Sequence, residues 1–134
     1  LDGDPQHAGF QFRASNEVAT KTSKETYYIR SNDGKGGQGK TKNWPQDKDM
    51  SNLPWKAQSI VVGGNRYTTL YLDHPDNPKP SFYSERDYGR FGSYFKSEIT
   101  PTAPLLIQYR LNVIKGERSK KECEELSHFF IKGN

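Results

Sequence analysis

Alternation of apolar and polar residues marks several short segments of the chain, and a period of two is typical of β-strands with one buried face. Segment 9–14 shows it, segment 26–30 is a β-prone run, and 105–114 places Leu105, Ile107, Tyr109, Leu111 and Val113 on one face. Segments 55–62 and 66–72 are also β-prone, and only Gly63-Gly64-Asn65 separates them. Two β-rich runs joined by a short glycine-containing loop predict a hairpin.

The hydrophobic period changes near the C-terminus. Ser119 followed by Glu122 predicts a capping box, in which the hydroxyl and the carboxylate each accept a free N–H at a helix start. Cys123, Leu126 and Phe130 then follow at helical spacing. The predicted fold is therefore mostly β, an antiparallel β-sandwich or half of one, with one C-terminal α-helix over about 119–131.

The domain organisation follows from length and composition. A chain of 134 residues suits a single domain, and 13% aromatic residues can fill a thin core. Residues 31–52 are polar and too long for a turn, so we expect a long flexible loop there. Hydrophobic residues make up only 31%. We therefore expect that much of residues 1–134 is loop, or that the missing apolar cover comes from an upstream half or a partner chain.

Charge and cysteine content exclude several functional classes. The formal net charge is +4, but the basic residues are interspersed with 16 acidic ones and form no block. Nucleic-acid binding needs a clustered basic stripe, so none is expected. No apolar run is long enough to span a membrane, so no membrane association is expected either. Cys123 is the only cysteine, which excludes an intrachain disulfide and a cysteine-based zinc site.

Residues 34–41 match the phosphate-binding pattern G-x-x-x-x-G-K-[ST]. A genuine phosphate loop leads into a helix at its lysine. Pro45 would break that helix in its second turn, and the residues that follow are too polar to pack on a sheet. We therefore expect a glycine-rich loop without nucleotide binding.

Three polar clusters are the candidate functional residues. The first holds His7 and Arg13, the second follows a predicted strand at 73–77, and the third interleaves aromatic and charged residues at 85–90. The second cluster suits an ordinary turn, a ligand site or a mixed N/O metal site. The third suits a sugar-binding surface or a salt-bridged strand, and Glu85 with Asp87 could form a glycosidase pair. The predicted ligand-binding residues are His7, Arg13, Asp73, His74, Asp76, Asn77, Glu85, Arg86, Tyr88 and Arg90.

Several segments together resemble a known bacterial family. They are 7–13, 63–67, 71–78, 84–92 and 106–113, and the run Leu72 to Pro78 is the most specific. On these residues the chain is similar to the PmoA-like family, also labelled methane oxygenase PmoA, and it looks like the C-terminal half of that family's domain. The resemblance implies an uncharacterised, exported β-sandwich protein met in settings of carbohydrate use, located in the periplasm or outside the cell. It does not imply methane oxidation.

Two functions remain open at this point. In the first, the chain binds or processes a carbohydrate, and the polar clusters meet at one end of the sandwich. In the second, it is a structural or protein-interaction domain, and the same residues only hold loops together. The sequence assigns neither a reaction nor a cofactor, so it leaves open whether the chain is an enzyme.

Overall fold

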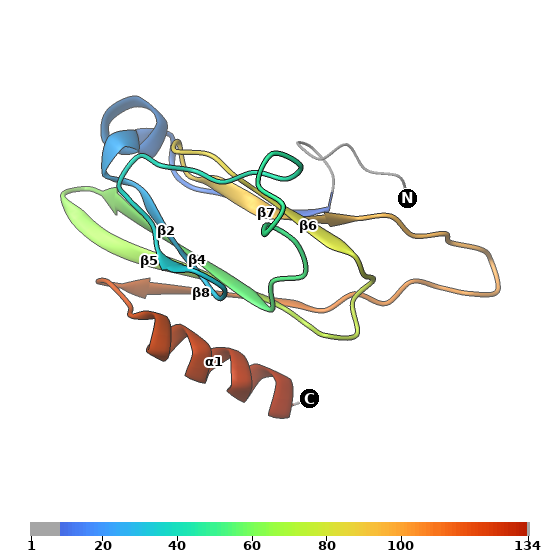
Figure 1. Cartoon of the computed structure of the whole chain (residues 1–134). Helices are drawn as coiled ribbons and strands as arrows, with labels where there is room; N and C mark the ends of the chain where they lie inside the picture. The colour runs from blue at the N-terminus through green and yellow to red at the C-terminus, as the bar shows by residue number, and fades with distance from the viewer. Residues whose placement is uncertain (1–8, 134) are drawn as a thin grey trace.

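Two antiparallel sheets packed face to face, with one helix against the outer face of the larger sheet, form the architecture of the computed structural model (Figure 1). The structure describes residues 9–133. The smaller sheet has the order β1-β7-β6, with β1 (Phe10–Arg13), β6 (Ser81–Glu85) and β7 (Arg90–Phe95). The larger sheet has the order β3-β2-β4-β5-β8, with β2 (Tyr27–Arg30), β3 (Gly34–Lys35), β4 (Trp55–Val62), β5 (Asn65–Asp73) and β8 (Tyr109–Lys115). This confirms the predicted mostly β fold with a sandwich of antiparallel sheets.

The predicted hairpin is the central β4–β5 pair. Its register runs without interruption from Trp55 opposite Leu72 to Val62 opposite Asn65. Gly63 and Gly64 form the two-residue turn with φ of +57° and +73°. Both angles lie in the left-handed region that residues with a Cβ rarely adopt, so two glycines at the tip fix the hairpin here.

Alternate residues of the central strands build two separate cores. Tyr27 and Ile29 of β2, with Trp55 of β4, face the helix and pack with its Cys123 and Phe130. The intervening residues face the smaller sheet and form an aromatic core; its buried members are Tyr28, Met50, Leu53, Tyr71, Tyr83 and Phe91. The middle of the larger sheet is therefore buried on both faces, which the sequence patterns did not suggest.

The C-terminal helix, α1 (Lys120–Lys132), begins as predicted. The Ser119 hydroxyl accepts a hydrogen bond from the Glu122 backbone N–H at 3.2 Å, and Glu122 accepts one from the Ser119 N–H at 2.7 Å. Cys123 is buried within the outer core, where burial raises the pKa of its thiol to about 11. Between β1 and β2 lie two short helical turns, η1 (Val18–Thr22) and η2 (Ser23–Glu25).

Two segments differ in detail from their predictions. The last strand begins at Tyr109 rather than at Leu105, and residues 96–108 instead form an arm that extends beyond the sheets (Figure 1). Residues 31–52 contain β3 and then run along the outer edge of β6. There Asn43 bridges to Ser84, and Ser51 bridges to Phe82. Met50, at the end of this run, is fully buried in the inner core.

The edge strands on the two sides of the sandwich are covered differently. On one side, which we call the closed side, β3 ends the larger sheet and the 43–51 segment covers the edge of β6. On the other, which we call the open side, β8 and β1 end their sheets, and within residues 9–133 no strand pairs with their outer edges. The 96–108 arm and the flank of α1 next to β8 belong to the open side.

Candidate functional site

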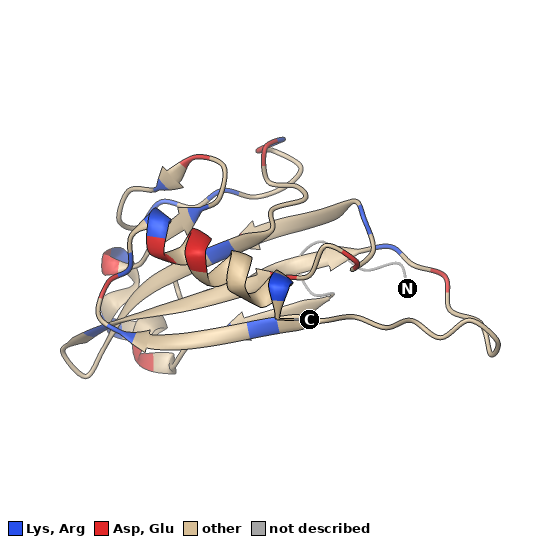
Figure 2. Ribbon diagram, turned by 90° about the horizontal axis from the view of Figure 1, so that it is seen from below, with Lys and Arg blue, Asp and Glu red and all other residues tan. Residues whose placement is uncertain are grey.

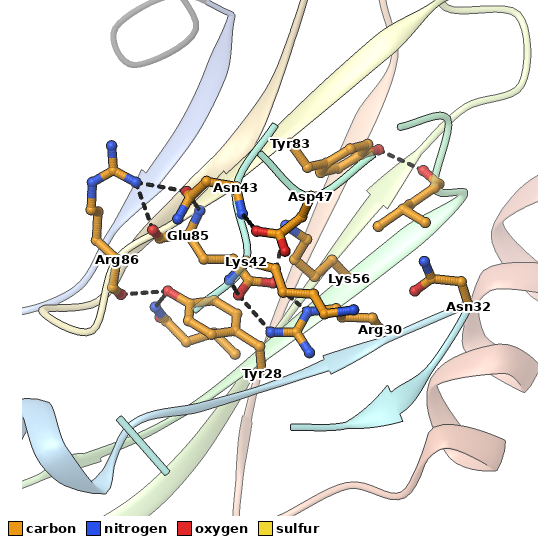
Figure 3. A network of polar contacts seen from close by, with 12 residues as sticks. Tyr28, Arg30, Asn32, Lys42, Asn43, Asp47, Lys56, Tyr83, Glu85 and Arg86 are labelled. Atoms are coloured by element: carbon orange, nitrogen blue, oxygen red, sulfur yellow. Dashed lines mark hydrogen bonds and ion pairs between the residues drawn. The ribbon is translucent and has the colours of Figure 1, made fainter. Parts of the chain in front are cut away.

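A buried ionic network lies between the sheets, next to the closed side (Figure 3). Its centre is Glu85, the last residue of β6, whose side chain is completely inaccessible to solvent. Arg30 of β2 donates two hydrogen bonds to it, from Nε to Oε1 and from Nη2 to Oε2, each 2.7 Å long. Lys56 of β4 places its Nζ 3.4 Å from Oε1 without hydrogen-bond geometry. One carboxylate therefore faces two buried cations.

Strand periodicity positions these groups. Arg30, Lys56 and Glu85 all occupy strand positions that face the space between the sheets. Tyr28 and Gln58 share that space, where Gln58 Nε2 donates to the Tyr28 hydroxyl at 2.8 Å. The Tyr28 hydroxyl in turn donates to the Arg86 carbonyl at 2.7 Å.

The 31–52 segment seals this network from solvent. The backbone N–H of Lys42 donates to Glu85 Oε2 at 2.7 Å. Asn43 Oδ1 accepts from the Glu85 N–H at 2.8 Å and from Arg86 Nη1 at 2.7 Å. The Lys42 ammonium points the other way, to Asp33 and Asp49 at 2.7 and 2.8 Å. Glu85 is thus held both by strands and by the covering segment.

Burial changes the protonation energetics of the network. Desolvation lowers the pKa of Lys56 to about 8, against an opposing pull from the Glu85 carboxylate. Desolvation also raises the pKa of Tyr28, and the nearby Glu85 charge adds to that increase. Lys56 is therefore poised to lose its proton only slightly above neutral pH, at a position that solvent does not reach.

The Asp73 cluster lies at the opposite end of β6. Asp73 Oδ2 accepts a hydrogen bond from the Tyr83 hydroxyl at 2.8 Å, and Oδ1 accepts one from Asn77 Nδ2 at 2.7 Å. Lys79 Nζ lies 3.4 Å from Oδ1. Asn77 also exchanges two hydrogen bonds of 2.7 Å with the backbone of Gln108. These contacts tie the 73–80 turn to the start of β8.

His74 and Asp76 complete this turn. The His74 Nδ1 accepts a hydrogen bond from the Asp76 N–H at 3.2 Å. The imidazole ring stands edge-on to Phe130 of α1, with ring centroids 5.6 Å apart. His74 is buried, while Asp76 is exposed. His74 is thus part of the packing between the turn and the helix.

The remaining predicted residues gather at the β6–β7 turn. The Arg13 guanidinium lies 5.4 Å from the centroid of the Tyr88 ring, and Arg13 is opposite Arg90 in the β1–β7 register. Arg86 begins the turn and bonds Asn43. Arg13 is exposed, and the other three are half-buried.

The predicted site residues are therefore separated rather than brought together. Asp73, His74, Asp76 and Asn77 lie before β6, and Arg13, Arg86, Tyr88 and Arg90 lie after it, while Glu85 points into the interior. His7 lies outside the described residues. The sequence expectation of a single polar site at one end of the sandwich does not correspond to this arrangement, because β6 runs between the two groups.

Sequence reasoning missed the partners of Glu85. Arg30 and Lys56 lie in strands that are buried on both faces, so a charged residue there is buried as well. Gln58 follows Lys56 on the same face of β4, and this polar pair inside a β-prone run was the available signal. Only the contact between sheets identifies Glu85 as their shared partner.

The two buried carboxylates, Glu85 and Asp73, are bonded within the fold. Glu85 and Asp73 both accept hydrogen bonds from internal donors and are at most 2% exposed. A general acid or base must reach a substrate proton. In the folded arrangement both carboxylates face internal partners instead. Over residues 9–133, no cluster of three or more His, Cys, Asp or Glu side chains is placed to hold a metal ion.

The open side carries a different kind of surface. Every exposed large hydrophobic side chain among residues 9–133 lies on it: Phe10, Ile99, Leu106, Ile107, Val113 and Phe129. Leu106, Phe129 and Val113 are 77%, 71% and 63% exposed. Phe10 stacks on Tyr109 of β8 with centroids 4.9 Å apart, which joins the edges of the two sheets into one apolar margin.

A groove of about 380 Å³ continues this margin along α1. Leu126 and Phe129 provide its apolar lining, and Arg118, Glu122 and Glu125 its charged rim. Lys120 on the other flank of the helix lies toward β3, next to Gly34. At 100° per residue this places the groove on the flank that faces β8. In Figure 2 the helix crosses the face of the sheet, and β8 forms the lower margin.

Comparison with protein families gives a match over nearly the whole chain. A family of unknown function, DUF6807, matches residues 2–128, nearly the whole chain. Neither the curated proteins nor the solved structures contain a match to the chain. In the part of the chain that the structure describes, no helix is long and apolar enough to cross a membrane. On the extent of its match, the chain belongs to the family of unknown function DUF6807.

Proposed function

We propose that this chain is a protein-interaction module that binds another polypeptide through its open side. The observation that carries the proposal is the segregation of every exposed large hydrophobic side chain in residues 9–133 to that side. Scattered surface hydrophobics are ordinary, but a group of them gathered beside strand edges that no strand among residues 9–133 pairs with is typical of a binding surface. An added strand would receive main-chain hydrogen bonds from β8 and side-chain contacts from Val113 and Phe129.

The buried network supports the same proposal. The charged residues that would serve a catalytic site are used to join the sheets to their covering segment. Arg30 and Glu85 form a two-hydrogen-bond pair in the interior, and Asp73 is bonded to Tyr83 and Asn77. This is the role expected of them in a structural or interaction domain.

Carbohydrate binding is the second candidate, favoured by one observation at the β6–β7 turn. Arg13 lies over the Tyr88 ring, and Asp87 and Arg90 flank that aromatic residue along the chain. An aromatic ring with charged groups of both signs suits the recognition of a sugar. The resemblance to the PmoA-like family, with its exported location and carbohydrate setting, belongs with this candidate.

A photocrosslinking experiment distinguishes the interaction module from the carbohydrate-binding candidate. A benzophenone amino acid replaces Val113 or Phe129 on the open side, and Lys40 on the 31–52 segment as the control, in cells producing the chain. We expect discrete polypeptide adducts from the open-side positions and none from the control. Equal labelling at all three positions would contradict the proposal. Binding on a glycan array that Tyr88→Ala abolishes would establish the second candidate instead.

A further inference from the structure

Within residues 9–133 no strand pairs with the outer edge of β8, and this edge lacks the features with which soluble proteins block edge strands. Such edges usually carry prolines, bulges or central charges, or are very short. β8 has 7 residues and pairs with β5 in an unbroken register from Tyr109 to Lys115. Its charges, Arg110 and Lys115, lie toward its ends, and Leu111 to Ile114 are uncharged. By contrast, β3 at the other edge has 2 residues.

The sequence of β8 is complementary to itself. When two copies pair antiparallel about a twofold axis at Asn112, Leu111 lies opposite Val113, and Arg110 lies opposite Ile114. Lys115 then lies opposite Tyr109, where an ammonium can approach an aromatic ring. No like charges face one another, and the whole strand is paired. An axis at Arg110 would instead oppose two guanidinium groups, which is unfavourable.

We infer that the occupant of the open side is a second copy of this chain, paired through β8 to form one continuous sheet across a twofold axis. This inference rests on the proposed function and names its partner. At the axis, each Asn112 amide offers a donor and an acceptor to the other, so the two can bond reciprocally. An isologous contact of this kind is the commonest way in which soluble chains associate.

The flank of α1 supports the same geometry. Pairing at β8 places both helices on one face of the joined sheet, with their groove flanks turned toward the axis. Each flank offers Leu126 and Phe129 as apolar surface. It also carries Arg118 together with Glu122 and Glu125, so both charge signs are available to the opposite flank. The groove that is open to solvent in one copy would be covered by the other.

Sedimentation velocity over a concentration series tests the inference through a charge swap at the axis. The wild type should sediment as a dimer. Asn112→Lys and Asn112→Asp would each place like charges opposite one another, so each should raise the dissociation constant of the dimer by about tenfold or more. An equimolar mixture of the two variants should restore the dimer, because opposite charges then meet. Asn65→Lys, the same substitution at the exposed β4–β5 hairpin tip, is the matched control and should leave association unchanged.

Each outcome bears on the inference. A wild type that is monomeric at all concentrations overturns it, and so does a dimer that neither Asn112 variant weakens. The proposed function is tested separately by the photocrosslinks. Adducts to other polypeptides at Val113, with a monomeric wild type, would retain the interaction module and reject the second copy as its partner. A monomer without adducts would reject both.

Discussion

The closed and the open sides of this sandwich differ in the length of their edge strands and in what covers them. On the closed side, a 2-residue edge strand ends the larger sheet, the 43–51 segment covers the edge of β6, and hydrogen bonds of Lys42 and Asn43 to Glu85 hold this cover to the interior. On the open side, a 7-residue strand ends the sheet, no strand among residues 9–133 pairs with its outer edge, and Val113 and Phe129 are exposed beside it. The contrast teaches that polar residues clustered in sequence can serve stability, while the side chains left exposed beside the edge strand are apolar.

The largest expected effect lies on the closed side. Glu85→Gln removes the carboxylate that faces the buried Arg30 and Lys56, leaves Arg30 only the partly exposed Asp33 at 3.6 Å, and weakens the hydrogen bond from the Lys42 N–H. We expect the free energy of unfolding to fall by about 3–5 kcal/mol, because an uncompensated buried charge is strongly destabilising. Urea denaturation followed by circular dichroism measures it. A loss below about 1 kcal/mol would show that the network does not hold the cover.

Lys56 gives the next largest effect, and it depends on pH. Its pKa is about 8 in the folded chain against 10.5 ordinarily, so unfolding takes up a proton between these values. Stability should therefore rise with pH over that range, by about 3 kcal/mol in all. Lys56→Met removes this rise and should be neutral or stabilising at pH 7, since Arg30 still pairs with Glu85.

The measurement is the difference in unfolding free energy between wild type and Lys56→Met at pH 7 and pH 10. Buried tyrosines such as Tyr83, whose pKa burial raises, oppose the rise above pH 10 in both proteins and so cancel in the difference. A difference that is the same at both pH values would contradict the assigned pKa of Lys56.

The smallest effect is expected on the open side and is the sharpest test of the comparison. Phe129 and Phe130 are neighbours in α1, with 71% and 4% of their surfaces exposed. Phe129→Ala should change monomer stability by less than about 0.5 kcal/mol. Phe130→Ala should lower it by about 3–5 kcal/mol, because it empties part of the outer core. Thermal and urea unfolding at low protein concentration would measure both, and similar losses would argue against a free open side.

Much of the fold could be predicted from local pattern. Gly63 and Gly64 between two β-prone runs predicted the hairpin, and Ser119 with Glu122 predicted the helix start, because turn and cap chemistry act over a few residues. The strand proposed at 105–114 was too long at its N-terminal end. Leu105 and Ile107 alternate as strand residues do, yet they lie in the arm, since alternation alone does not supply a neighbouring strand.

The site could be predicted only in part. Asp73, Asn77 and Glu85 were predicted to be ligand-binding residues, and in the structure their carboxylates and amide face internal partners. Arg30 and Lys56, which decide what Glu85 does, lie 55 and 29 positions away along the chain. Their contact depends on which faces of which sheets meet, and local spacing carries no information about that.

By itself, the sequence determined the class of fold, the hairpin, the capped helix and the exclusion of an intrachain disulfide. Those features depend on backbone preferences and on residue types within a few positions. The tertiary structure alone decided that Glu85 is buried between two cations, that β6 separates the two polar groups, and that exposed apolar side chains gather beside β8. The physical reason is that burial and pairing are set by the packing of distant segments, so the same residue types can form a ligand site or a structural joint.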